Sequence, residues 1–168
     1  AQCELAREYA QLDQVYNTMG LIELARGRTK EAMSHFKQAI ALNADFVEAH
    51  CNIGLVWKQR RDNQMAADAY LSGIEIDPGF LPCRENLATA YFALGKYKKA
   101  QSEYLKCTEL KANHCDCRNG LGQVALKQND LPLASQHFQK LVGICRQDAE
   151  AWYNYGFVEF QLGRCEKA

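Results

Sequence analysis

Cysteine and histidine are the residues of this chain most able to do chemistry. The 168 residues include eight cysteines and four histidines. The two types gather at His114, Cys115 and Cys117, with Cys107 a short distance upstream. Thiolates and imidazoles bind zinc, whereas thiols form disulfides in an oxidising compartment. Three roles are therefore open to these cysteines: metal ligands, disulfides, or small apolar groups in a core.

A zinc site is disfavoured by the spacing of these residues. The "HCDC" run at residues 114–117 lacks the C-x-x-C spacing typical of structural zinc sites. The helical register of Cys107 also predicts that its side chain points into the protein. We therefore expect no metal and no cofactor, and we interpret Cys83, Cys107 and Cys117 as small buried groups.

Motifs of enzymes are absent from the sequence. It has no Gly-rich phosphate loop, no H-E-x-x-H and no serine elbow. Cys51 follows His50 directly, but neighbours on a helix point about 100° apart. The sequence therefore predicts a protein that is not an enzyme.

The element that positions these residues is a unit that recurs every 34 residues. Two series of small residues follow this spacing: Gly20, Gly54, Ala88, Gly122 and Gly156, and Ala32, Ala66, Ala100, Ala134 and Ala168. Large aromatic residues recur with them, at Phe36, Tyr70, Tyr104 and Phe138. Helices approach closely only where one presents Gly or Ala, so the period predicts stacked helix hairpins with aromatic side chains seated on small residues.

Turn residues follow the same period. Gly27, Gly95, Gly163 and Asn129 lie where the first helix of a hairpin must end in a left-handed residue. Arg61 takes this place in the second unit, where we expect a strained or rearranged turn with help from the adjacent Asp62 and Asn63.

This pattern resembles the tetratricopeptide repeat family, most clearly in "AEAWYNYG" at residues 149–156. The resemblance implies an all-α, right-handed superhelical solenoid of antiparallel helix hairpins with about ten helices. The single array 1–168 then comprises a partial helix at 1–12, four full repeats at 13–46, 47–80, 81–114 and 115–148, and an incomplete repeat at 149–168.

The incomplete last repeat carries several large apolar residues. We expect Tyr155, Phe157, Val158 and Phe160 to leave apolar surface open. Such an uncapped repeat would permit self-association.

Cys115 and Cys145 occupy positions 1 and 31 of one predicted repeat, at adjacent ends of two antiparallel helices. A disulfide there would close a loop of about 30 residues and stabilise the fold by roughly 3 to 4 kcal/mol. Cys83 and Cys107 are placed similarly in the preceding repeat. Oxidised pairs would indicate a periplasmic or exported protein, and free thiols a cytoplasmic one.

The resemblance further implies a concave groove lined by the first helices. Asparagines recur there at Asn52, Asn86 and Asn154, with Asn17 and Asn119 one position earlier in their repeats. A column of carboxamides can donate to and accept from a peptide backbone. A similar asparagine ladder occurs in the glycosyltransferase that attaches N-acetylglucosamine to nuclear and cytosolic proteins. Around these amides we place Leu55, Glu85, Phe92, Gln123, Tyr153, Phe157 and Phe160.

Charge and hydropathy exclude two other classes of partner. Twenty basic and twenty acidic residues give no net charge, which argues against nucleic acid as a ligand. No apolar run reaches the roughly 18 to 20 residues of a membrane span. The sequence therefore predicts a scaffold or adaptor that binds a peptide segment or helix of a partner protein in the groove.

Two narrower interpretations remain open. The stretches "HCDCRNGLG" and "GICRQDAEAWYNYG" resemble the pilotin lipoproteins that assist assembly of the type IV pilus secretin, which carry a similar cysteine pair. Alternatively, the repeats would form the substrate-targeting arm of a larger enzyme such as a glycosyltransferase.

Overall fold

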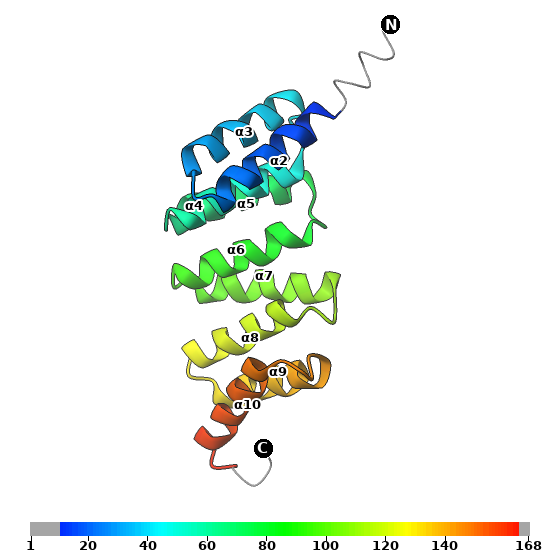
Figure 1. Cartoon of the computed structure of the whole chain (residues 1–168). Helices are drawn as coiled ribbons and strands as arrows, with labels where there is room; N and C mark the ends of the chain where they lie inside the picture. Colours follow the sequence, from blue (N-terminus) through cyan, green and yellow to red (C-terminus); the bar gives the residue numbers. More distant parts are fainter. Residues whose placement is uncertain (1–10, 165–168) are drawn as a thin grey trace, which may run out of the picture. The chain divides into compact units, whose positions relative to one another are not determined.

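The computed structural model describes residues 11–164, which form nine helices and no strand (Figure 1). The helices are α2 (Leu12–Ala25), α3 (Thr29–Leu42), α4 (Val47–Gln59), α5 (Asn63–Ile76), α6 (Leu81–Ala93), α7 (Tyr97–Leu110), α8 (Cys115–Lys127), α9 (Leu131–Ile144) and α10 (Ala149–Gln161). The predicted all-α fold is confirmed, with nine helices described instead of about ten. The helix predicted at 1–12 falls almost entirely outside the described residues.

The helices begin at a constant interval. The second helices of successive hairpins start at Thr29, Asn63, Tyr97 and Leu131, each 34 residues after the one before. The first helices from α4 onward start at Val47, Leu81, Cys115 and Ala149, with the same interval. The period found in the sequence is therefore the period of the helices.

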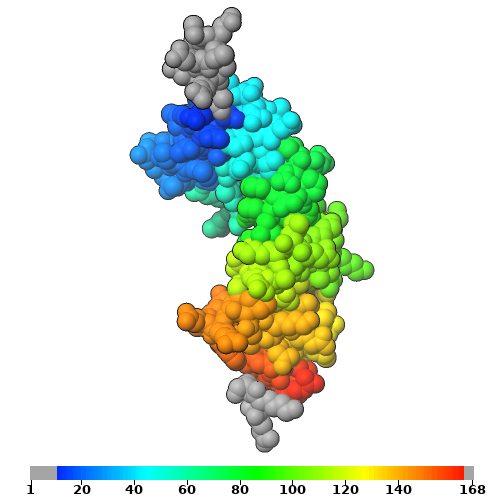
Figure 2. Space-filling view, turned by 90° about the vertical axis from the view of Figure 1, so that its right-hand side faces the viewer, coloured from blue at the N-terminus to red at the C-terminus, as the bar shows by residue number. Residues whose placement is uncertain are grey.

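The chain forms two compact units, residues 1–90 and 91–168, and the boundary falls inside α6. In unit 1, α2 packs against α3, α4 packs against α5, and α4 also contacts α2 and α3. Figure 2 shows the surface of α2, α3 and α4 in blue to cyan. In unit 2, α8 packs against α7 and α9, and α9 packs against α10.

Aromatic side chains seated on glycine hold the hairpins together. Phe36, Tyr70 and Phe138 are fully buried. A Cβ atom on Gly20 would lie 2.5 Å from the Phe36 ring, and one on Gly122 would lie 2.5 Å from the Phe138 ring. These distances are shorter than real Cβ contacts, so only glycine fits.

Gly54 follows this rule, whereas Gly156 does not. Gly54 faces the Tyr70 ring at an equally short distance. At Gly156, by contrast, an added Cβ would meet no described atom within 4 Å. The predicted seats are therefore confirmed at three of the glycines in the series, whereas no described side chain is seated on Gly156.

The turns within the hairpins adopt left-handed backbone, as expected. The φ angles are 77° at Gly27, 71° at Gly95, 70° at Gly163, 59° at Asn129 and 62° at Arg61. Arg61 has a Cβ in this region, which costs about 1 to 2 kcal/mol. The following Asp62 caps α5, because its carboxylate accepts a hydrogen bond from the Met65 N–H at 3.0 Å. Asp130 caps α9 in the same way through the Leu133 N–H.

The last helix differs from expectation at Val158 and in part at Tyr155. Val158 is fully buried and packs with Phe138, Leu141 and Ala151 in the core of unit 2. The prediction that Val158 leaves apolar surface open is therefore wrong, because this side of α10 faces α9. Phe157 and Phe160 are exposed as predicted, and Tyr155 is half-buried.

Candidate functional site

Unit 1 contains a pocket of about 220 Å³ between α2, α4 and the start of α6. Its lining residues are Asn17, Leu21, Glu48, Cys51, Asn52, Leu55, Phe80, Pro82 and Asn86. The four that come from α4 follow the i, i+3, i+4, i+7 pattern, so they share one face of that helix. Four predicted groove residues thus meet at one place: Asn17, Asn52, Leu55 and Asn86.

Two carboxamides at this pocket bind each other. The Asn52 Nδ2 donates to Asn17 Oδ1 at 2.7 Å, and both side chains are half-buried. Within residues 11–164, the amino group of Asn17 and the oxygen of Asn52 have no hydrogen-bond partner. One donor and one acceptor are what a single residue of peptide backbone requires.

The amide of Asn86 is used differently. Its Nδ2 donates to the Pro82 carbonyl at 2.8 Å, and its Oδ1 accepts from Lys58 Nζ at 3.3 Å. Asn86 therefore positions the start of α6 and one lysine. Glu85, which precedes it, is half-buried and does not line the pocket, whereas the exposed Glu48 gives the rim a negative charge.

A disulfide forms part of the pocket wall. Cys51 of α4 is bonded to Cys83 of α6, with Cα atoms 5.4 Å apart. A Cβ on Gly73 would lie 2.5 Å from Cys83 Sγ and 3.0 Å from Cys51 Sγ. The bridge therefore occupies the space that glycine leaves open on α5.

Sequence reasoning missed the Cys51–Cys83 pair. It placed Cys83 beside Cys107 in one repeat, but Cys107 is bonded to Cys117, so that interpretation is wrong. The available signal was Gly73, because a glycine has no Cβ and so leaves room on α5 for the two sulfur atoms of the bridge.

Unit 2 contains the remaining predicted groove residues. Asn154 Nδ2 donates to Asn119 Oδ1 at 3.4 Å, and Asn154 is only 9% exposed. Gln123 and Phe92 are half-buried, and the Phe92 ring packs edge-on against Tyr97. Three aromatic groove residues of α10 face solvent, with Tyr153 72%, Phe160 70% and Phe157 43% exposed.

Gly120 occupies the repeat position that is asparagine at Asn52, Asn86 and Asn154, and the reason is steric. The Tyr104 ring of α7 lies against Gly120 where a Cβ would be. An asparagine at this position would displace that ring, so the amide of α8 comes from Asn119 instead.

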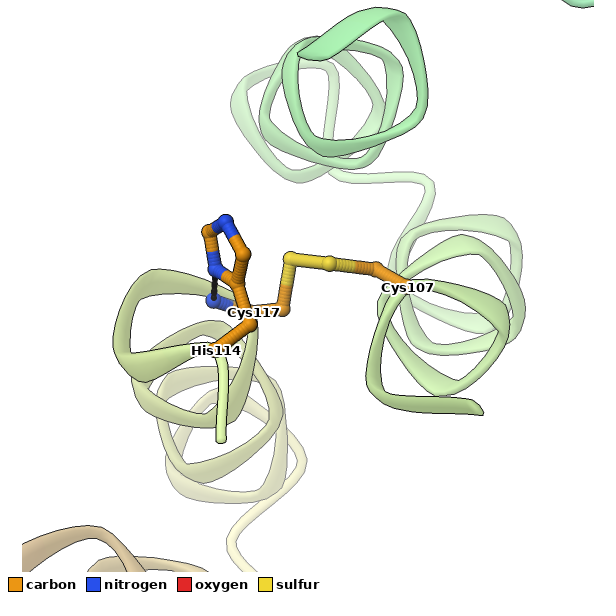
Figure 3. A group of neighbouring side chains, drawn as sticks. All are labelled: Cys107, His114 and Cys117. Atoms are coloured by element: carbon orange, nitrogen blue, oxygen red, sulfur yellow. Dashed lines mark hydrogen bonds between the residues drawn. A yellow bond between two sulfur atoms is a disulfide. The ribbon is translucent and has the colours of Figure 1, made fainter. Parts of the chain in front are cut away.

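Two further disulfides lie in unit 2. One joins Cys115 to Cys145, the pair singled out from the sequence, with Cα atoms 6.3 Å apart. The other joins Cys107 of α7 to Cys117 of α8, with Cα atoms 6.2 Å apart (Figure 3). Cys83, Cys107 and Cys117 are fully buried, as predicted, but all three are disulfide-bonded, so their interpretation as simple packing groups is wrong.

Helix hairpins spaced by 34 residues and carrying aromatic side chains on glycine seats define a helical repeat protein. Two family models refine this class: one for a TPR repeat matches residues 20–60, and one for a tetratricopeptide repeat matches residues 82–114. These two matches support the tetratricopeptide repeat family that the sequence resembles. Such repeats generally serve as non-catalytic interaction modules, which supports a protein-interaction scaffold as the broad class of this chain.

Known proteins similar to the chain are distant in sequence. Human protein O-mannosyl-transferase TMTC3 is 22% identical over 148 residues, which cover 79% of this chain and 16% of that protein. The structure of pilF from Pseudomonas aeruginosa has a TM-score of 0.84 at 18% identity, covering 92% of this chain and 70% of pilF. YrrB, a TPR protein with an unusual peptide-binding site, has a TM-score of 0.76 at 18% identity, covering 99% of this chain and 86% of YrrB.

The structural likenesses support the fold predicted from the sequence. The chain spans only 16% of the length of TMTC3. Among residues 11–164, no helix combines the length and apolar character needed to cross a membrane.

Proposed function

We propose that the pocket of unit 1 binds an extended peptide segment of a partner protein through its backbone and one apolar side chain. The observation that carries this proposal is the Asn17–Asn52 pair, which presents an amino group and an oxygen at the pocket. This pair replaces the longer predicted ladder of Asn52, Asn86 and Asn154, because the Asn86 amide is already bonded within the protein.

The size and lining of the pocket favour a single apolar side chain. Leu21, Leu55, Phe80 and Pro82 supply apolar walls around about 220 Å³. Sites for drug-sized molecules are larger, about 300 to 1,000 Å³. The exposed carboxylate of Glu48 at the rim favours a basic residue beside the apolar one in the bound segment.

A displayed library of random dodecapeptides, panned against the whole chain, tests this function. We expect enrichment of peptides with an apolar residue next to Lys or Arg. Fluorescence anisotropy with the best peptide should show at least about tenfold weaker binding to the Asn17→Ala, Asn52→Ala double variant, because two hydrogen bonds are lost. Asn154→Ala is the matched control, and its affinity should equal that of the wild type.

A second variant tests the pocket independently of the amides. Leu55→Trp places an indole in the apolar space and should abolish binding while circular dichroism stays helical. Equal peptide affinity in the Leu55→Trp and Asn17→Ala, Asn52→Ala proteins and the wild type would refute the pocket as the binding site.

A second candidate function is an exported protein that assists secretin assembly, as predicted from the resemblance to pilotins. The Cys115–Cys145 bridge and the fold shared with pilF favour it. In that case thiol titration of the native protein in denaturant without reductant should find at most two free thiols, because residues 11–164 contain three disulfides and the chain has eight cysteines. Eight free thiols in protein isolated from its own cell would refute export.

Two other predictions have weaker support. The match to part of TMTC3 favours repeats that serve as the targeting arm of a larger enzyme.

The exposed Tyr153, Phe157 and Phe160 favour self-association through α10. Sedimentation velocity of wild type and Phe160→Asp over a range of concentrations should show a dimer in the wild type alone, and a monomer in both would exclude association.

A further inference from the structure

One histidine and two cysteines form a compact cluster in unit 2. One ligand atom each from Cys107, His114 and Cys117 lie within 4.8 Å of one another. Figure 3 shows Cys107 on one helix and the other two residues at the start of the next, with the imidazole beside the disulfide. None of the three lines the peptide pocket of unit 1.

We propose that reduction of the Cys107–Cys117 disulfide creates a site for a zinc-type ion held by Cys107, Cys117 and His114. A dithiol reductant transfers two electrons and two protons to the bridge and becomes a disulfide itself, leaving two thiols. The divalent ion then binds both sulfurs and one imidazole nitrogen, and the two thiol protons pass to solvent.

The distances in the cluster suit this ion. Zinc binds sulfur at about 2.3 Å and imidazole nitrogen at about 2.0 to 2.1 Å, so ligands of one ion lie about 4 Å apart. Opening the sulfur–sulfur bond moves the two Sγ atoms toward that separation without moving a helix, since the Cα atoms are 6.2 Å apart. Three protein ligands leave the fourth tetrahedral position for water or a partner's group.

The surroundings favour a thiolate at Cys117. Cys117 lies in the first turn of α8, and His114 is its N-cap. The N-terminal end of a helix carries partial positive charge, which stabilises a nearby anion. Cys107 and Cys117 are fully buried while His114 is half-buried, so the ion enters beside the imidazole.

The proposed site differs from the expectation drawn from spacing. The C-x-x-C rule applies to ligands that share a tight local loop. Here Cys107 comes from α7, and it points at α8, as its bond to Cys117 demonstrates. The second and third ligands come from the turn that starts α8, so helix packing brings the three together.

The chain offers a matched control for the site. The Cys51–Cys83 bridge is also buried and also joins two helices. Among the described residues, neither of these cysteines belongs to a group of three potential ligands. Reduction should therefore give two ordinary thiols there.

The test titrates the reduced whole chain with Co²⁺ and then Zn²⁺. The protein is treated with a phosphine reductant, desalted without oxygen and followed by near-ultraviolet and visible absorption. We expect one Co²⁺ per chain with a sulfur-to-cobalt charge-transfer band and intense tetrahedral d–d bands, displaced by Zn²⁺. The unreduced protein should show neither feature.

Variants assign the ligands. Cys51→Ala, Cys83→Ala and Cys115→Ala, Cys145→Ala should keep the spectrum, whereas Cys107→Ala, Cys117→Ala should lose it. His114→Asn should weaken Co²⁺ binding at least about tenfold while keeping α8 capped, because asparagine is a good N-cap. The proposal is overturned if His114→Asn binds cobalt as the wild type does, or if the spectrum depends on Cys115 and Cys145.

Discussion

In unit 1 the Asn52 amide reaches Asn17, and in unit 2 the Asn154 amide reaches Asn119, across the same 35 residues of sequence. The first contact is 2.7 Å long, half-buried and beside an apolar pocket. The second is 3.4 Å long, and its donor is almost completely buried. Identical repeat positions therefore hold a half-buried amide pair beside a pocket in one unit and a pair with an almost completely buried donor in the other, because neighbouring side chains decide how much solvent each amide meets.

The largest effect that tests this comparison concerns the glycine seats, which both units share. Gly54→Leu and Gly122→Leu should each lower the free energy of unfolding by about 3 kcal/mol, since the new side chain collides with Tyr70 or Phe138. Urea titration followed by circular dichroism measures this change. Gly156→Leu is the control and should not destabilise, because no described atom lies near it. Equal losses at all three positions would show that helix packing is not the cause.

The second-largest expected effect is a difference in how much the two asparagine pairs contribute to the free energy of unfolding. Asn154→Ala should cost about 1 to 2 kcal/mol of stability, because it removes a buried amide and leaves Asn119 without its donor. Asn52→Ala should cost less than about 1 kcal/mol, since water reaches its half-buried partner. The same urea titrations measure both. A larger loss for Asn52→Ala would reverse the roles assigned to the two pairs.

The turns provide a smaller contrast. Arg61 in unit 1 and Asn129 in unit 2 both adopt left-handed backbone. Arg61→Gly should stabilise the protein by about 1 kcal/mol, because glycine adopts positive φ without steric conflict. Asn129→Gly should change stability by only a few tenths of a kcal/mol, since asparagine tolerates this region. Thermal unfolding measures both, and an Arg61→Gly protein that melts below the wild type would contradict the strain.

The smallest effect concerns two histidines at one repeat position. His35 stacks on Tyr16 in unit 1, whereas the Nδ1 atom of His137 in unit 2 is buried without a partner among the described residues. Burial, followed by the positive charges of Lys140 and Arg118, lowers the pKa of His137 below its ordinary value.

The sign of the resulting pH dependence follows from this shift. The unfolded chain binds a proton at His137 near pH 6.5, whereas the folded protein resists it until lower pH. Stability therefore falls as the pH decreases through 6.5. Urea titrations between pH 5 and 8 should show a weaker decrease for His137→Gln than for the wild type, and parallel curves would contradict the shift.

Local rules were sufficient to predict the helices and their contacts. A glycine and an aromatic residue that recur together specify one close helix pair, so Gly20 and Phe36 could be matched from the sequence alone. The turn at Arg61 followed from its place in the repeat. The burial of Val158 was missed, because the side of α10 that faces α9 depends on packing.

The site was less predictable, because its properties arise from contacts between repeats. The groove residues could be named from their repeat positions, but the bonds from Lys58 and to Pro82 that occupy the Asn86 amide could not. The cysteine partners had the same difficulty. Cys51 and Cys83 meet only because Gly73, on another helix, leaves space for them.

The bridge between Cys51 and Cys83 also controls what happens when the backbone is cut. Residues 77–80 join α5 to α6 and lie inside the loop that this bridge closes. A protease that cleaves there would leave the two fragments covalently attached until a reductant separates them. In an oxidising environment, cleavage of this surface loop would therefore not release either part of the chain.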